Sequence, residues 1–448
     1  MHQSSSLPSG LTDTKPRPGP TADPRPGDIP ASRQGGEHLA GWARLAQYVN
    51  AEPIPLSVLD LVPVDERLDT GQALRFTTEL ARRTEEWGYR RFWVAEHHNM
   101  PAIASSAPAV LLAHLAATTS TIRVGSGGVM LPNHAPLVVA EQFGTLAALH
   151  PDRIDLGIGR APGTDQRTAL ALRRTAAGLG AEEFPQELAA LAGMLVGDPE
   201  YLRSVPQPAR PPQLWLLGSS GYSAQLAGLL GLPFAFAHHF AAANTEPALA
   251  LYRERFRPSA QLERPYAMVA VNVVCAESDE RAEYLAKPGL ISFMRLRAGR
   301  PEPLPSPEHA AEYEFSPAEA AFAAERRQGQ ALGSPKAVRA QLAELVSRTN
   351  ADELMITSQL YDVEDRLRSY QLVAELALSR PDRAAEGTGG NREETSPHSA
   401  PPVSASRYSA SRSDSVSGAN NSPGGQPRAR SMATAVASEQ DSRRPVTR

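Results

Sequence analysis

The sequence has a single cysteine and no long hydrophobic run. Because Cys275 is alone among 448 residues, an internal disulfide and a multi-cysteine metal site are excluded. No stretch has the roughly 18 uninterrupted apolar residues of a membrane-spanning helix, and the first residues lack the apolar segment of a secretory signal. We therefore expect a cytoplasmic protein.

An excess of positive charge is also missing. Lys and Arg number 45 against 49 Asp and Glu, which gives a formal net charge of −4. A chain with this balance has no basic field that would attract nucleic acid or an anionic membrane surface. The balance favours a small organic molecule as the partner.

The two ends of the chain lack hydrophobic periodicity. Residues 1–50 and 381–448 are rich in Pro, Ser and Gly, and the second segment is also rich in Arg. Such segments cannot bury enough apolar area to offset the entropy lost on ordering. The sequence predicts two disordered extensions around one folded domain at 51–380.

Within that domain, short runs of strand-forming residues alternate with helical patterns such as the one at 70–87. Eight strands are predicted, at 56–61, 90–96, 122–131, 153–159, 214–219, 233–238, 266–276 and 352–357. Eight β/α units in about 325 residues predict an α/β fold of the (β/α)₈ TIM-barrel type. The long connections at 160–212 and 286–350 predict insertions that help to cover the site.

The loops that follow the strands of such a barrel form one rim, so residues far apart in the sequence converge there. These positions hold imidazoles, small residues and an arginine: Glu96, His97 and His98; Gly127, Gly128, Asn133 and His134; Arg160; Ser219, Ser220, Gly221, Tyr222 and Ser223; His238 and His239; Thr357, Ser358 and Gln359. The rim is therefore where we expect the functional site.

Two pairs of adjacent histidines stand at this rim. Neighbours in an extended chain point in opposite directions, so His97 with His98, or His238 with His239, do not easily hold one metal ion. One imidazole of each pair facing the lumen suits proton transfer or a hydrogen bond to a ligand. A metal site stays open as an alternative.

Three glycine-containing stretches are candidates for ligand contact. "GSSGYSAQLA" (218–227) places serines at a helix start, which suits an anion such as phosphate but is also typical of ordinary helix caps. "GSGGVMLPNH" (125–134) puts glycines into a central strand, where a flat ring or a simple bend would explain them. "DLGIGRAPG" (155–163) has the wrong spacing for a dinucleotide-binding turn.

Together with "WVAEHHNMPAIASSAPAVLLAHLAATT" (93–119) and "ADELMITSQLYDVEDRLRSYQLVAE" (351–375), these stretches resemble the bacterial luciferase-like flavin-dependent monooxygenases, in particular the single-chain oxidoreductases of that family. The resemblance spans nearly the whole predicted domain. It implies a TIM barrel that binds reduced FMN at the rim, where O₂ forms a C4a-hydroperoxyflavin that oxidises a small organic substrate.

The resemblance also implies roles for individual residues. His97 is similar to the family's active-site histidine, with Glu96 and His98 beside it as further catalytic candidates. The implied cofactor contacts are a non-prolyl cis peptide between Gly127 and Gly128 under the flavin ring, phosphate ligands Arg160, Ser220 and Ser223, and the backbone N–H groups of Gly221 and Tyr222. A separate flavin reductase and a homodimer are the implied partners.

The sequence departs from the light-emitting members of the family. Gly159 stands where those proteins have a reactive cysteine, so aldehyde-dependent light emission is not expected, and Cys275, inside a predicted strand, is expected to be an inert core thiol. Three rival interpretations stay open: hydride transfer with the deazaflavin F420 on the same fold, flavin binding without turnover, and a metal-dependent hydrolase.

Overall fold

The computed structural model describes residues 53–172 and 182–378. The extensions predicted at 1–50 and 381–448 lie outside these residues. Within the described part, the strands are β1 (Leu56–Asp60), β2 (Arg91–Val94), β3 (Arg123–Met130), β4 (Ile154–Gly159), β5 (Gln213–Gly218), β6 (Phe234–Phe236), β7 (Ala267–Cys275), β8 (Gln330–Gly333) and β9 (Glu353–Thr357).

Helices follow or separate these strands. They are α2 (Thr70–Glu86), α3 (Pro108–Thr118), α4 (Pro136–Leu149), α5 (Gln166–Leu172), α6 (Phe184–Val196), α7 (Gly221–Leu230), α8 (Thr245–Arg255), α9 (Asp279–Arg297), α10 (Pro307–Glu312), α11 (Pro317–Arg327), α12 (Pro335–Thr349) and α13 (Val363–Ala374), with short 3₁₀ turns η1 (Leu131–Asn133) and η2 (Ala242–Asn244). Among the described residues, no helix combines the length and the apolar character needed to cross a bilayer.

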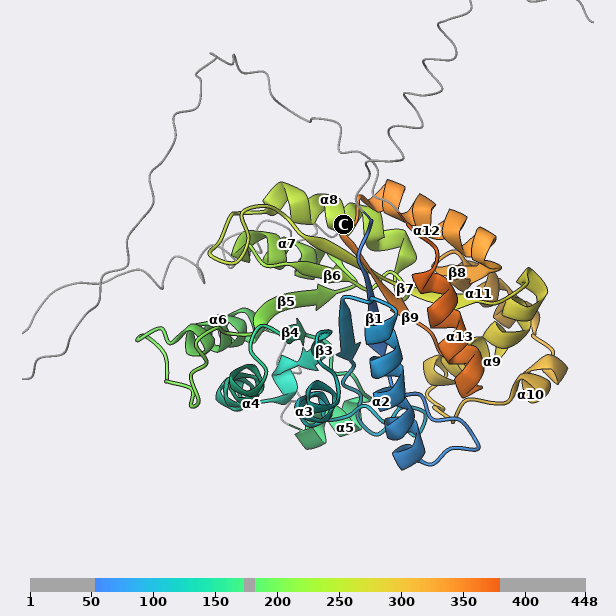
Figure 1. Ribbon diagram of the computed structural model, residues 1–448, viewed down its shortest axis with the longest axis horizontal. Helices are drawn as coiled ribbons and strands as arrows, with labels where there is room; N and C mark the ends of the chain where they lie inside the picture. The colour runs from blue at the N-terminus through green and yellow to red at the C-terminus, as the bar shows by residue number, and fades with distance from the viewer. Residues whose placement is uncertain (1–52, 173–181, 379–448) are drawn as a thin grey trace, which may run out of the picture. The chain divides into compact units, whose positions relative to one another are not determined.

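Eight strands close into a parallel barrel. Parallel pairs run β6–β5–β4–β3–β2–β1–β9–β7, and the pairing of β6 with β7 completes the circle. The helices lie around the strands (Figure 1). The predicted TIM barrel is therefore confirmed, and all eight predicted strands are present with ends shifted by at most two residues.

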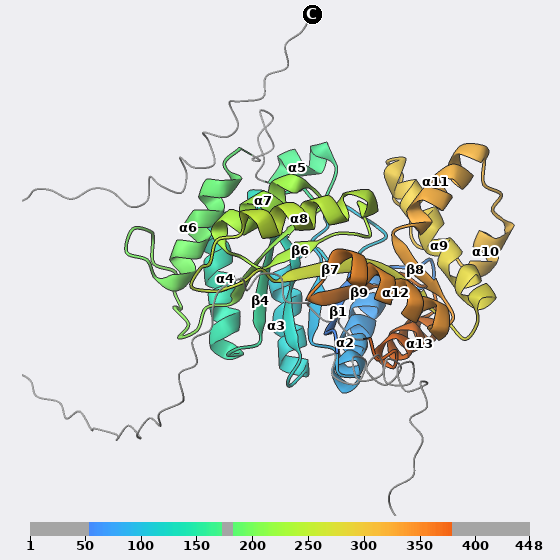
Figure 2. The same cartoon turned by 90° about the horizontal axis from the view of Figure 1, so that it is seen from above.

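One strand was not predicted. β8 pairs with Asn272–Cys275 at the far end of β7, on the edge opposite β9, because Asn272 pairs with Thr357 of β9 and with Gln330 of β8. It has four residues and lies inside the 286–350 insertion. Helices α9, α10 and α11 lie together beside it (Figure 2). This insertion is a packed substructure rather than a long loop.

Period-two alternation along the strands divides the core into two layers. Phe92 and Val94 face outward into the large cluster between barrel and helices, whereas Trp93 faces the barrel interior. There its ring meets that of Trp215 edge to face, with centroids 5.2 Å apart. Helix α2 begins where the sequence predicts, because Asp69 and Gln72 form a reciprocal capping box at its N-terminus.

A buried ionic network closes the N-terminal end of the barrel. Asp155 accepts hydrogen bonds from Arg91 Nη1 at 2.8 Å, Arg123 Nε at 2.9 Å and Trp93 Nε1 at 3.0 Å. Glu353 accepts from Arg91 Nε at 3.0 Å. Both carboxylates are fully buried, so their charges depend on these partners.

Asp155→Ala is expected to lower the free energy of unfolding by about 3–5 kcal/mol, because it leaves a buried arginine short of a partner. Urea denaturation followed by circular dichroism measures the loss. Arg210→Ala is the matched control: its pair with Asp152 is exposed, so it should cost no more than about 1 kcal/mol. Equal losses in the two variants would contradict a network held by burial.

Candidate functional site at the barrel rim

Glu96 is the hub of the rim. It directly follows β2, and its side chain is fully buried. Its carboxylate accepts hydrogen bonds from His98 Nε2 at 2.9 Å, His134 Nε2 at 2.9 Å, Asn133 Nδ2 at 3.0 Å and the backbone N–H of Met130 at 3.1 Å. One carboxylate therefore ties the end of β2 to the end of β3.

These contacts determine the charge of Glu96. Burial alone would raise the pKa of its carboxyl, but the hydrogen bonds from His134, His98 and Asn133 outweigh burial and lower the pKa to about 2. The group is ionised at neutral pH, so it accepts hydrogen bonds and does not donate protons. Because a carboxylate only accepts, His98 and His134 both present a protonated Nε2 to it.

His97 turns away from this hub. Its Nδ1 lies 3.1 Å from the carbonyl oxygen of Gly163, in the loop after β4, and its backbone N–H donates to Ser105 at 2.9 Å. A carbonyl only accepts, so Nδ1 carries the proton and the neutral ring has a lone pair on Nε2. Burial lowers the pKa of His97 below its usual value, which favours this neutral form.

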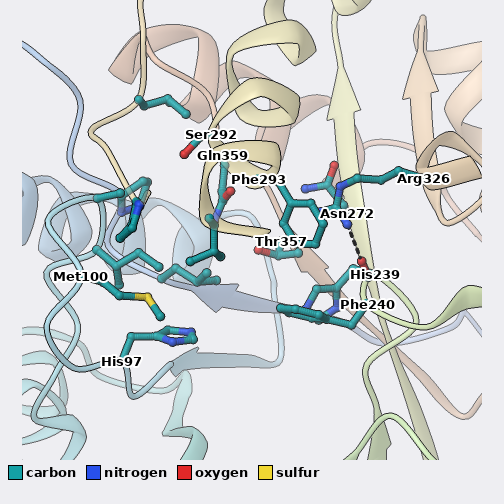
Figure 3. Close-up of a pocket in the computed structure, with 17 residues that line it drawn as sticks. His97, Met100, His239, Phe240, Asn272, Ser292, Phe293, Arg326, Thr357 and Gln359 are labelled. Carbon is teal, nitrogen blue, oxygen red and sulfur yellow. Dashed lines mark hydrogen bonds between the residues drawn. The ribbon is translucent and has the colours of Figure 1, made fainter. Parts of the chain in front are cut away.

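A cavity opens on the rim beside His97, with about 770 Å³ of space including its mouth. Its apolar wall includes Leu61, Met100, Ile103, Phe240, Phe293, Leu296 and Leu304. Its polar wall consists of His97, His239, Asn272, Ser292, Arg326, Thr357 and Gln359. Figure 3 shows His97 and Met100 on one side, and His239, Phe240 and Arg326 on the other.

The second pair of histidines divides in the same way as the first. His239 lines the cavity, and its Nδ1 bonds the carbonyl oxygen of Ala270 at 3.1 Å, whereas His238 is buried with its Nδ1 2.7 Å from the hydroxyl of Thr245. Burial is the main reason that the pKa of His239 falls to about 4, so its ring is neutral at pH 7. As the alternation predicts, one imidazole of each pair faces the lumen.

The candidate anion site lies at the ends of β4 and β5. Helix α7 begins directly after Ser220, whose side chain makes no capping hydrogen bond. The guanidinium carbon of Arg160 is 4.1 Å from the centroid of the Tyr222 ring, so the strand-end arginine and the helix N-terminus are neighbours. Free N–H groups and a cation at one place fit the phosphate of a nucleotide cofactor.

The Gly127–Gly128 peptide is cis, as the resemblance implies. Its place beneath a flavin ring stays a prediction. A Cβ on Gly127 would lie 2.6 Å from Leu59 Cδ1, and one on Gly128 would lie 2.8 Å from the carbonyl oxygen of Gly157. Backbone packing therefore excludes a side chain at Gly128, whatever binds there, whereas a side chain at Gly127 would require the end of Leu59 to move.

The structure separates the predicted site residues into three groups. His97 lines the cavity, whereas Glu96 and His98 do not. Outside the lining, at the ends of β4 and β5, lies the candidate anion site, which consists of Arg160, Ser220, Gly221, Tyr222 and Ser223. Within residues 53–172 and 182–378, no group of three or more His, Cys, Asp or Glu side chains is arranged to hold a metal ion.

Sequence reasoning missed the individual residues that the 286–350 insertion contributes to the cavity wall. Phe293 and Leu296 come from α9, and Arg326 comes from α11. The expected cover is present there, but the described residues of the other insertion, 160–212, contribute none of the cavity lining. No motif marks Phe293 or Arg326, because their place depends on how these helices pack.

Comparisons with known proteins agree with this geometry. The family described as luciferase-like monooxygenase matches residues 54–352. The chain belongs to this family. A luciferase-like monooxygenase of Escherichia coli (strain K12) is 47% identical over 325 residues, which cover 72% of this chain and 97% of that protein. The N-acetyl-S-alkylcysteine monooxygenase of Bacillus subtilis (strain 168) is 35% identical over 73% of this chain and 99% of its own length.

Solved structures share the fold of this chain. Apo-MsnO8 is 38% identical, with a TM-score of 0.65, over 73% of this chain and all of that one. The oxygenating constituent of 3,6-diketocamphane monooxygenase from Pseudomonas putida, in complex with FMN, has a TM-score of 0.58 at 17% identity and covers 74% of this chain and all of that one. An F420-dependent secondary alcohol dehydrogenase has a TM-score of 0.53 at 13% identity and covers 73% and 99%. The last two likenesses show the fold alone.

Cys275 fits the expectation of an inert core thiol. It lies in β7 and is buried, and burial raises the pKa of its thiol to about 12. A thiol with this pKa is neither a nucleophile nor a redox group at neutral pH.

Glu96→Gln is expected to lower the free energy of unfolding by roughly 3 kcal/mol at pH 7, because the carboxyl pKa falls from 4.5 to about 2 on folding. A lowered pKa contributes stability above pH 4.5, and that contribution is lost as the pH falls toward 2. The difference in unfolding free energy between wild type and variant should therefore be constant from pH 7 to 5.5 and become smaller below pH 4.5. Urea titrations across this range measure it.

Glu86→Gln serves as the control, because Glu86 forms an exposed pair with Arg83 on α2. That variant should differ from wild type by less than about 1 kcal/mol at every pH. If the loss of unfolding free energy in Glu96→Gln does not change with pH, the charge of Glu96 is not what stabilises the rim.

Proposed function

We propose that this protein is a monooxygenase that uses reduced FMN and O₂ to oxidise a small organic substrate in the rim cavity. The observation that carries the proposal is the joint presence, at one rim, of a cation beside a helix N-terminus and a largely apolar cavity with a neutral imidazole. Family membership supports it. Reduced FMN, when bound, would supply the electrons that activate O₂.

The residues of the anion site suit the phosphate of FMN. Arg160 offers a charged fork, and the N–H groups of Gly221, Tyr222 and Ser223 point out of the first turn of α7. The hydroxyl of Ser220 is not used to cap that helix, so it is available to a ligand. We assign all five residues to cofactor binding, together with the Gly127–Gly128 peptide under the ring.

His97 is proposed as the catalytic residue. His97 lines the cavity, its Nδ1 is held by Gly163, and its lowered pKa favours the neutral ring, so Nε2 can accept a proton and return it. Glu96 and His98 are proposed as positioning residues: Glu96 holds His98, while the loop at Gly163 holds the ring of His97 and the backbone N–H of His98. The apolar wall limits water around the reacting atoms.

F420 stays the alternative cofactor, because proteins that use it share the fold. With F420, hydride transfer would replace the reaction with O₂. Flavin binding without turnover is a further alternative. We further propose a separate flavin reductase as the source of reduced FMN. A cytoplasmic location stays a prediction.

A homodimer through the helices beside the early strands is part of the proposal. Val110 on α3 and Val138 on α4 are 72% and 46% exposed, so apolar side chains stand on this face without cover from the described residues. Sedimentation of the full chain as a monomer at micromolar concentration would contradict the dimer.

Arg160→Met is expected to weaken FMN binding about 10- to 100-fold, because hydrogen bonds to charged groups contribute roughly 1.5–3 kcal/mol. Quenching of flavin fluorescence measures the affinity, with F420 titrated in parallel. Arg257→Met, at an exposed position near the end of α8, should leave the affinity unchanged. Tighter binding of F420 than of FMN would replace the proposed cofactor.

His97→Asn tests the reaction itself. Stopped-flow mixing of protein loaded with reduced FMN with O₂ should show, in wild type, an absorbance phase between the spectra of reduced and oxidised flavin. Removing the proton acceptor should change the rate of that phase by at least about 100-fold, while FMN affinity is retained. Direct reoxidation in wild type, with no effect of the variant, would exclude the oxygenase.

A further inference from the structure

Arg326 is a cationic side chain in the cavity wall that the proposed chemistry does not use. It comes from α11, and its guanidinium carbon lies 3.4 Å from the centroid of the Phe293 ring. Its Nη1 donates to the backbone carbonyl of His239 at 3.1 Å. Figure 3 shows the guanidinium of Arg326 beside Phe293 and Asn272, with its hydrogen bond to His239. The stacked ring and the carbonyl hold the group in place.

The hydrogen-bonding capacity of this guanidinium is only partly used. Its Nε is buried and has no hydrogen-bond partner among the described residues, and no described carboxylate pairs with it. By contrast, buried Arg91 and Arg366 are each paired with carboxylates, at 2.8 Å and 2.6 Å. A buried donor without a partner is rare in proteins and requires an explanation.

The surroundings of Arg326 disfavour its positive charge when no anion is nearby. Burial, followed by repulsion from Arg297, lowers the pKa of Arg326 to about 10, so the group still carries its charge at pH 7. A charge that is partly removed from water costs free energy unless an opposite charge offsets it. The missing partner is an anion.

The donors left on Arg326 indicate where an anion would bind. Nη1 donates to the carbonyl of His239 and Nε is closed to solvent, so Nη2 is the arm of the guanidinium fork that remains for a negatively charged oxygen of a ligand in the cavity. The other polar groups that line this part of the cavity, such as Asn272 and Thr357, are neutral, and the nearby Arg297 does not line it. One guanidinium therefore faces a ligand here, which suits the single negative charge of a carboxylate.

We propose that the substrate of this cavity is an organic acid whose carboxylate pairs with Arg326 and whose apolar part lies against Phe293 and Met100, toward His97. This inference rests on the proposed function for the reaction that follows binding. It extends that function by naming the substrate class and the residue that selects it. Selection arises because an uncharged analogue would leave the guanidinium unpaired.

The test compares an acid with its uncharged amide. Isothermal titration calorimetry of the full-length protein, first without flavin and then with oxidised FMN, uses 4-phenylbutanoate and 4-phenylbutanamide as probes. Wild type should bind the acid about 10- to 100-fold more tightly than the amide. Arg326→Met should remove this preference by weakening the acid alone, and Arg326→Lys should retain part of it, because a lysine keeps the charge without the fork.

Arg297→Met is the matched control: this arginine is exposed, contacts Phe322 at 5.8 Å and does not line the cavity, so the preference should persist. The proposal is overturned if wild type does not distinguish acid from amide, or if Arg326→Met keeps the preference. Tighter binding of 3-phenylpropyl phosphate than of the acid would overturn the assignment to a carboxylate.

Two further outcomes separate this inference from the proposed function. Loss of FMN affinity in Arg326→Met, without any change for the acid, would assign Arg326 to the cofactor and overturn the inference. Failure of wild type to bind either flavin would end the proposed function, whereas the preference for the acid, measured without flavin, would stand.

Discussion

The rim depends on one buried carboxylate. Glu96 is fully buried and accepts four hydrogen bonds that come from the ends of two neighbouring strands. Without a negative charge at this point, His98, His134 and the backbone N–H of Met130 would lose a charged acceptor, and hydrogen bonds to charged groups contribute about 1.5–3 kcal/mol each. The wall that carries His97 is therefore built on an electrostatic constraint, to which hydrophobic packing is added.

This constraint explains how the rim divides its tasks. The ends of β4 and β5 gather a cation and a helix N-terminus, whereas the ends of β1, β2, β7 and β9 surround the cavity. Gly163 lies three residues after Arg160 in one loop, and its carbonyl accepts from His97. The loop that carries Arg160 therefore also holds the ring of His97, so one short segment positions both side chains.

How much was predictable follows from the physics of each feature. Period-two alternation and the barrel rule locate strand ends, so the places of His97 and Arg160 at one rim followed from the sequence. The direction in which a side chain turns after its strand does not follow from the sequence, so it could not be predicted that His97 lines the cavity whereas Glu96 and His98 bond each other and do not line it. The place of Arg326 in the cavity wall could not be predicted, because it depends on how α11 packs against the barrel. The four residues of β8 are too few to show a period.

The N-terminal end of the barrel depends on a balance of buried charges rather than on one carboxylate. Two positive and two negative side chains from four strands balance each other there: Arg91, Asp155 and Glu353, which are buried, and Arg123, which is partly exposed. A change of sign at one position leaves a surplus that the others do not absorb, so their substitution effects are non-additive. A substitution in this ionic network is tolerated only when a second substitution restores the charge balance. Single substitutions in the cavity wall formed by α9 and α11 do not disturb that balance. New substrate preferences therefore have an evolutionary route that leaves the foundation of the barrel untouched.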